Sequence, residues 1–267
     1  MSMEVESVDS VAQIRAAMTG SATYYAGGTL LMRQINYGDQ GINRLVISDD
    51  PVLKQIQIHS DQVIIGAGST MSEIMRHSDL QFLANVARSV GGPAIRNMAT
   101  LGGNLFAPRP YGDMTTALLA LDANVIWADG QQQPIEQFLQ HPLTSSGIVI
   151  SVSLPRPASG TFRYLKISRV KPKGVSLMTL AAVLGRENGR VGVARIAFGG
   201  MGPQSRRAKA AEHALQGASL DESGVERCLA VCTDGMDPSD DALASAWYRQ
   251  QVAPVYLKRL LLQRSEY

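Results

Sequence analysis

Residues 95–105 read Ile-Arg-Asn-Met-Ala-Thr-Leu-Gly-Gly-Asn-Leu and lie in a segment, 90–113, that has neither helical nor strand periodicity. A structureless stretch of more than about 20 residues inside a compact domain is uncommon unless it forms a functional site. The Gly102-Gly103 pair lets the backbone approach a ligand closely, and Thr100 and Asn104 offer hydrogen-bonding side chains. We therefore expect residues 95–105, which we call the second glycine loop, to bind a cofactor.

A first glycine loop precedes it in Tyr25-Ala26-Gly27-Gly28-Thr29-Leu30-Leu31, between a short expected strand and a helix. Because glycine lacks Cβ, backbone N–H groups here can turn toward an anion, and the start of a helix adds a favourable dipole. The loop is suited to a pyrophosphate, although an ordinary tight strand-to-helix turn explains the fragment equally well. Two such loops facing one cofactor explain more than either loop alone.

Asp113 closes the segment that holds the second loop. Its carboxylate is expected to serve as the N-cap of the helix that follows, to accept a ribityl or ribose hydroxyl of the cofactor, or to do both.

The pattern around these loops predicts alternating helices and strands, divided by a linker at Pro155-Arg156-Pro157 and Ser159-Gly160. Thr70 and Glu73 form an expected capping box, Asp79 an expected cap, and Asn188-Gly189 an expected hairpin turn. The expected helices span residues 8–18, 70–76, 79–89, 113–121, 205–216, 223–232 and 241–262. The expected strands span residues 23–25, 44–47, 53–58, 62–65, 124–128, 148–154, 162–169, 177–186 and 191–198.

Composition argues against several classes of protein. The net charge of +2 is too small to favour a nucleic-acid binder. No run approaches the roughly 20 apolar residues that span a bilayer, and the first ten residues do not resemble a secretion signal, so we expect a cytoplasmic protein. The four histidines are isolated, which supports no metal site, and Cys228 and Cys232 are expected to be helix-surface or core thiols. Gly66-Ala67-Gly68 begins like a dinucleotide fingerprint, but Met71 stands where that motif needs glycine, so we assign no Rossmann site there.

The order of these motifs resembles the FAD-binding medium subunits of molybdenum hydroxylases, of the xanthine dehydrogenase and carbon monoxide dehydrogenase type. The resemblance starts at the two glycine loops and covers nearly the whole chain. Its further members are Pro110, Asp113, Leu118 to Ala123, Lys166 to Arg169, Ala194 to Gly199, Asp237 to Asp241 and Ser245 to Arg249. The chain departs from the family's pattern at Leu30, Val90 and Gly174.

This resemblance implies an α+β chain with a two-lobed FAD-binding domain of the PCMH, or vanillyl-alcohol-oxidase, type over residues 1–157. The lobes would cover about 1–50 and 51–157, and residues 158–267 would form a small C-terminal domain of three antiparallel strands and a helical bundle, like that of carbon monoxide dehydrogenase flavoproteins. No residue of the chain is implied to be catalytic or to bind a metal. The implied FAD contacts are Ala26, Gly27, Gly28, Thr29, Leu30, Leu31, Val90, Gly91, Thr100, Gly102, Gly103, Asn104, Asp113, Ile148 and Lys166.

The resemblance also implies a function in electron transfer. Electrons would leave a substrate at a molybdenum cofactor on a large subunit, cross iron-sulfur clusters on a small subunit, reach FAD here, and pass to NAD or another acceptor. Because a cluster takes four thiolates and the chain has two cysteines, any cluster must belong to a partner. The alternatives are a flavin-free assembly subunit and a free-standing flavin oxidase.

Overall fold

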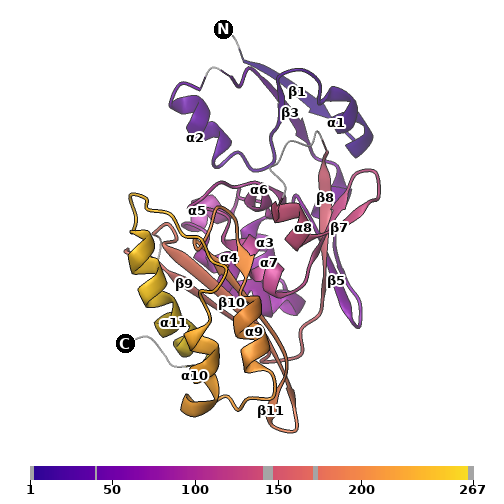
Figure 1. Ribbon diagram of the computed structural model, residues 1–267. Helices are drawn as coiled ribbons and strands as arrows, with labels where there is room; N and C mark the ends of the chain where they lie inside the picture. Colours follow the sequence, from indigo (N-terminus) through magenta and orange to yellow (C-terminus); the bar gives the residue numbers. More distant parts are fainter. Residues whose placement is uncertain (1–2, 40, 141–146, 171–173, 264–267) are drawn as a thin grey trace. The chain divides into compact units, whose positions relative to one another are not determined.

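The computed structural model describes residues 3–39, 41–140, 147–170 and 174–263. By proximity of Cα atoms, the chain divides into two compact units (Figure 1). The N-terminal unit comprises residues 1–107 and 124–154, and the C-terminal unit comprises residues 108–123 and 155–267. A short part of the chain, 108–123, therefore leaves the first unit and packs with the second.

The N-terminal unit begins with a small parallel sheet in the order β1-β3-β2. The sequence pattern missed β1, because its apolar Val5 is 58% exposed and its neighbours are acidic. The helix expected from residue 8 instead begins at Val11, where the Ser10 side chain accepts from the backbone N–H of Gln13. The elements here are β1 (Glu4–Val8), α1 (Val11–Ala17), β2 (Ala22–Tyr24), α2 (Leu31–Asn36) and β3 (Arg44–Ser48).

A five-stranded sheet in the order β4-β5-β8-β6-β7 forms the rest of this unit. The predicted capping box of Thr70 and Glu73 is confirmed, whereas the predicted cap at Asp79 is wrong, because Asp79 lies inside a short 3-10 helix and Leu80 precedes α4. The strands are β4 (Ile56–Ile58), β5 (Gln62–Gly66), β6 (Asn124–Trp127), β7 (Gln132–Pro134) and β8 (Val149–Pro155). The helices are η1 (Pro51–Lys54), α3 (Met71–Arg76), η2 (Ser78–Leu80), α4 (Gln81–Ser89), α5 (Pro93–Arg96), α6 (Leu101–Leu105) and α8 (Ile135–Gln140).

The C-terminal unit contains the three predicted antiparallel strands and, beside β11, a fourth strand of two residues, in the order β12-β11-β10-β9. Asn188 and Gly189 both have positive φ, as the predicted hairpin turn requires. None of the described helices is long and apolar enough to cross a membrane. The elements are α7 (Asp113–Ala120), β9 (Phe162–Ile167), β10 (Met178–Glu187), β11 (Arg190–Gly199), β12 (Arg206–Arg207), α9 (Lys209–Leu215), α10 (Glu222–Ala230) and α11 (Ala246–Leu262).

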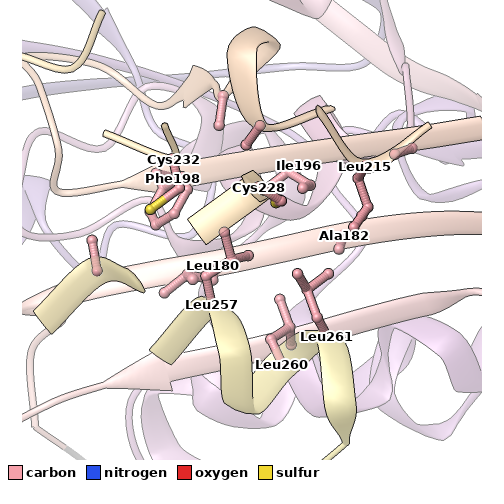
Figure 2. Close-up of a cluster of buried hydrophobic side chains, with 14 of the residues drawn as sticks. Leu180, Ala182, Ile196, Phe198, Leu215, Cys228, Cys232, Leu257, Leu260 and Leu261 are labelled. Carbon is pink, nitrogen blue, oxygen red and sulfur yellow. The ribbon is translucent and has the colours of Figure 1, made fainter. Parts of the chain in front are cut away.

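One face of this sheet and the last three helices enclose a continuous apolar core. Leu180 and Phe198 project from the strands toward Leu257 of α11 and Cys228 of α10, as Figure 2 shows. Apolar burial of this kind contributes roughly 25 cal/mol per Å², so the helices are held mainly by this face.

Both cysteines belong to that core and are free thiols. Burial raises the pKa of Cys228 to about 12, with a further contribution from Cys232, and burial raises the pKa of Cys232 to about 11. The thiolate is the reactive form, so both side chains should be inert at neutral pH. We expect a chromogenic disulfide reagent to titrate neither thiol in the native protein and both after denaturation. Rapid reaction of either thiol in the folded state would contradict the buried placement.

Candidate cofactor site

The N-terminal unit contains a cavity of about 600 Å³ whose wall includes residues of both glycine loops. This volume falls within the range of roughly 300–1,000 Å³ that is usual for small-molecule and cofactor sites. The lining residues are Met18, Ala22, Thr23, Tyr24, Tyr25, Ala26, Gly27, Ser48, Asp49, Leu53, Lys54, Ala67, Gly68, Thr70, Asn97, Met98, Thr100, Gly102, Gly103, Phe106, Gly147, Ile148 and Val149.

The first glycine loop reaches this wall at Tyr25, Ala26 and Gly27, and its glycines leave the backbone bare. Gly28 has a φ of +65°, which favours glycine, and its carbonyl accepts from the N–H of Met32 at 2.8 Å as α2 begins. Among the described residues, no acceptor pairs with the backbone N–H groups of Gly27, Gly28 and Thr29. Because backbone donors in folded proteins are usually paired, these three groups are available to a ligand.

The two loops touch each other through backbone atoms. A Cβ placed on Gly27 would lie 1.8 Å from the carbonyl oxygen of Met98 in the second loop. No side chain fits in that space, so glycine at position 27 is what allows the loops to meet.

The second glycine loop is held rigidly by its own hydrogen bonds. Thr100 caps α6, and its Oγ1 accepts from the N–H of Gly103 at 3.1 Å. The N–H of Gly102 donates to the carbonyl of Ala67 at 2.7 Å, and a Cβ on Gly102 would approach Ala67 to 3.1 Å. The amides of this glycine pair are therefore already used, and the pair's small size serves packing against the turn at 66–68.

That turn, Gly66-Ala67-Gly68, is a part of the site that the sequence analysis did not assign. Ala67 and Gly68 line the cavity, and the N–H of Gly68 donates to the carbonyl of Leu53 at 2.6 Å. The sequence signal for this turn is a pair of glycines directly after a strand, a pattern that also begins a dinucleotide fingerprint. The turn instead packs against the second glycine loop, through the contact of Ala67 with Gly102.

The predicted site residues are only partly brought together. Gly28, Thr29, Leu30 and Leu31 continue the first loop into α2, and Asn104 is buried within α6. Val90 and Gly91 lie between α4 and α5 and are not among the lining residues of the cavity. The predicted residues that line it are Ala26, Gly27, Thr100, Gly102, Gly103 and Ile148.

Asp113 and Lys166 belong to the C-terminal unit and contact each other. Lys166 Nζ donates to Asp113 Oδ2 at 2.7 Å, and Ser176 Oγ donates to Asp113 Oδ1. Both side chains are largely buried, with 11% of Lys166 and 8% of Asp113 exposed. The prediction that Asp113 is a helix N-cap is wrong, because Gly112, with a φ of 88°, occupies that position and Asp113 is the first helical residue.

Several wall residues were not predicted as cofactor contacts, above all Tyr24 and Phe106, and Tyr25, which opens the first glycine loop. Tyr24 is partly buried beside the acidic pair Asp49 and Asp50. Burial, with a smaller contribution from these two carboxylates, raises its pKa to about 12. Tyr24 is therefore a neutral phenol at any physiological pH.

A cavity of this volume, walled by two glycine loops in one unit and followed in the chain by an α+β unit, is typical of a cofactor-binding protein. Residues 2–157 match the family described as the FAD binding domain in molybdopterin dehydrogenase. Residues 163–264 match the CO dehydrogenase flavoprotein C-terminal domain. The chain belongs to this family, the FAD-binding medium subunits of molybdenum hydroxylases, and the resemblance inferred from its motifs is confirmed.

Relatives and solved structures agree with this assignment. The chain is 28% identical over 256 residues to the nicotinate dehydrogenase FAD-subunit of Eubacterium barkeri, covering 89% of this chain and 86% of the relative. It is 26% identical over 258 residues to the xanthine dehydrogenase FAD-binding subunit of Escherichia coli O157:H7, covering 90% and 87%.

In fold, the chain is similar to carbon monoxide dehydrogenase from Hydrogenophaga pseudoflava, with a TM-score of 0.91, 24% identity and coverage of 98% and 96%. Quinoline 2-oxidoreductase from Pseudomonas putida 86 gives a TM-score of 0.90, 23% identity and the same coverage. The predicted mixed fold, an FAD-binding part followed by a C-terminal part, and FAD as the cofactor are confirmed.

Proposed function

We propose that this chain holds FAD in the cavity of the N-terminal unit and acts as the electron-transferring subunit of a multi-subunit molybdenum hydroxylase. It would accept electrons from iron-sulfur clusters on a small subunit and pass them to NAD or another acceptor. The observation that carries the proposal is the meeting of two glycine loops at one cavity, with three backbone N–H groups on the first loop that no described residue accepts from. We further propose residues 1–157, with lobes at about 1–50 and 51–157, as the FAD-binding domain and residues 158–267 as the C-terminal domain.

The residues present fit the cofactor. The N–H groups of Gly27, Gly28 and Thr29 would bind the diphosphate, because unpaired amides in a turn form a concave site for anions. The second loop would form the opposite wall, with Thr100 and Asn104 beside the ribityl chain. Val90 and Gly91 would pack against the isoalloxazine, and Ile148 would contact the adenine or the flavin. Leu30 and Leu31 would continue the wall of the first loop.

The proposed partners follow from what the chain lacks and from its relatives. With two cysteines, both in an apolar core, the chain offers no set of four thiolates for a cluster. One of its relatives, 23% identical over 269 residues, is the medium chain of carbon monoxide dehydrogenase from Hydrogenophaga pseudoflava. We infer a large subunit with the molybdenum cofactor and a small subunit with two-iron two-sulfur clusters as partners.

The first test is whether the purified chain carries flavin. The expected result is a yellow protein with flavin absorbance, or an apo-protein that quenches or enhances FAD fluorescence stoichiometrically on titration. A colourless protein that FAD cannot reconstitute would favour a flavin-free assembly subunit. Substrate-dependent bleaching of the isolated chain would favour a free-standing oxidase, since the proposed subunit needs its partners to receive electrons.

We also propose that Lys166 lies at the edge of the flavin ring, with Asp113 setting its position and accepting a sugar or ribityl hydroxyl. When bound, FAD would supply the chemistry of taking up two electrons and releasing them to an acceptor. Uptake of the electrons increases the negative charge at the N1 and O2 edge of the ring. A cation at that edge stabilises the charge.

Lys166→Met should therefore make the midpoint potential of the bound flavin more negative, by about 30 mV or more, equivalent to ~1.4 kcal/mol for two electrons. The control is Lys258→Met, which removes a cation that pairs with Glu222 elsewhere in the same unit. Equal potentials in wild type and Lys166→Met would place Lys166 away from the ring. Thermal unfolding is measured in parallel, because the substitution also leaves the Asp113 carboxylate without its cation.

A further inference from the structure

Tyr25 opens the first glycine loop, and the proposed phosphate contacts do not explain why its ring lies against Gly28. Its backbone N–H donates to the carbonyl of Val46 at 2.8 Å, so the residue is anchored beside the small sheet. A Cβ placed on Gly28 would lie 2.3 Å from each of Cε2, Cζ and Oη of Tyr25. The hydroxyl end of the ring, and not its base, therefore covers the backbone of Gly28.

The Tyr25 hydroxyl has no hydrogen-bond partner among the described residues. The residue is half-buried and lines the cavity, and its hydroxyl is not buried, so a ligand in the cavity could reach it. Within the described part of the chain, the backbone N–H groups of Gly28, which the ring covers, and of its neighbours Gly27 and Thr29 have no acceptor either. Four hydrogen-bond donors that have no acceptor among the described residues thus come from residues 25–29, and two of them, those of Tyr25 and Gly27, belong to residues that line the cavity.

We propose that the Tyr25 hydroxyl donates a hydrogen bond to the diphosphate of FAD, as a fourth donor beside the three amides. This inference rests on the proposed function of the cavity. An anion with several acceptor oxygens matches four donors that come from one short stretch of chain. A phenol adds a donor without adding charge, and its rigid ring loses little conformational freedom when it binds.

The contact gives Gly28 a second role. Its positive φ disfavours any side chain, and the missing Cβ also leaves the space that the Tyr25 ring fills. Tyr25 and Gly28 therefore act as a pair, in which the bare backbone fixes the direction of the hydroxyl. Tyr25 is accordingly a residue that positions FAD, and no chemistry is assigned to it.

The test compares Tyr25→Phe with wild type in titrations of the apo-protein with FAD and with riboflavin, which lacks the diphosphate. Losing a hydrogen bond to a charged group should raise the Kd for FAD by about 10-fold or more. The Kd for riboflavin should change by less than about twofold, because the ring and its packing are kept. Phosphorus NMR of bound FAD should show a shifted diphosphate signal in the variant. The control is Tyr37→Phe, which removes a hydroxyl from a side chain that is 79% exposed.

The outcomes separate this inference from the function on which it rests. An unchanged Kd for FAD and unchanged phosphorus signals in Tyr25→Phe would overturn the proposed contact while leaving FAD binding intact. Tighter FAD binding by the variant would also overturn it, by showing that the ring shields the loop. A similar loss of affinity for FAD and riboflavin would assign Tyr25 a packing role instead. Failure of the wild-type chain to bind either flavin would refute the proposed function itself.

Discussion

Gly27→Ala is expected to weaken FAD binding by about 100-fold or more, equivalent to ~2.7 kcal/mol. The added methyl group would lie 1.8 Å from the carbonyl oxygen and 2.7 Å from the carbonyl carbon of Met98. These are backbone atoms, so no side chain can rotate away, and the two glycine loops must separate. Overpacking of this kind costs about 1–3 kcal/mol or more. The strain falls where the diphosphate would bind, so affinity for FAD should fall more than stability does.

The measurement is a fluorescence titration with FAD, paired with thermal unfolding of the apo-protein. Gly185→Ala is the matched control, because its added methyl group would meet Val193 only at ordinary contact distances of 3.5–3.8 Å. A Gly27→Ala protein that binds FAD as tightly as wild type would show that the loops are not held together in the bound state. The cavity would then need a different occupant.

Both glycine loops could be predicted from the sequence because each is marked by local chemistry. A glycine pair between a strand and a helix is visible in the chain itself, and so is the capping box of Thr70 and Glu73, which the structure confirms. Other local expectations failed where a neighbouring residue competed. Gly112 adopts the left-handed conformation that places Asp113 inside the helix, which leaves the carboxylate to Lys166 and Ser176.

The rest of the site depends on contacts between distant segments, which no single segment reveals. Tyr25 opens the first glycine loop, but the loop motif does not reveal that its ring lies against Gly28 or that the residue lines the cavity. Similarly, Ala67 is held beside the second glycine loop because its carbonyl accepts a hydrogen bond from the N–H of Gly102. The residues that could be predicted from the sequence are therefore those in glycine-rich turns. The missed residues have ordinary side chains that reach the cavity only because distant segments pack together.

The largest expected loss of stability is for Arg249→Met in the C-terminal unit. Arg249 is fully buried at the start of α11 and donates to the carbonyls of Leu177, Ser239 and Ala244 and to both carboxylate oxygens of Asp241. Arg249→Met leaves the buried carbonyl of Leu177 and the part-buried carbonyls of Ser239 and Ala244 without this donor, at about 1–3 kcal/mol for each buried acceptor left unpaired. The Asp241 carboxylate is 33% exposed and keeps its hydrogen bonds from Arg109, Leu243 and Ala244. We expect thermal and denaturant unfolding of the C-terminal unit to show this loss, and the exposed control Arg227→Met to change stability by less than about 0.5 kcal/mol.

The same network predicts a pH dependence of stability that should be weaker in the variant, which keeps the hydrogen bonds from Leu243 and Ala244 to Asp241. Burial of the Asp241 carboxyl tends to raise its pKa, but hydrogen bonds from Arg249 and from the N–H groups of Ala244 and Leu243 outweigh burial and hold the pKa at about 2, below the ordinary 3.8. A lowered pKa means that the folded state favours the ionised carboxylate. The stabilisation is therefore complete above about pH 4 and is lost as pH falls toward 2. Wild type should lose part of its advantage over Arg249→Met in this acid range, and a constant difference between the two from pH 7 to pH 2 would show that the ion pair does not stabilise the fold.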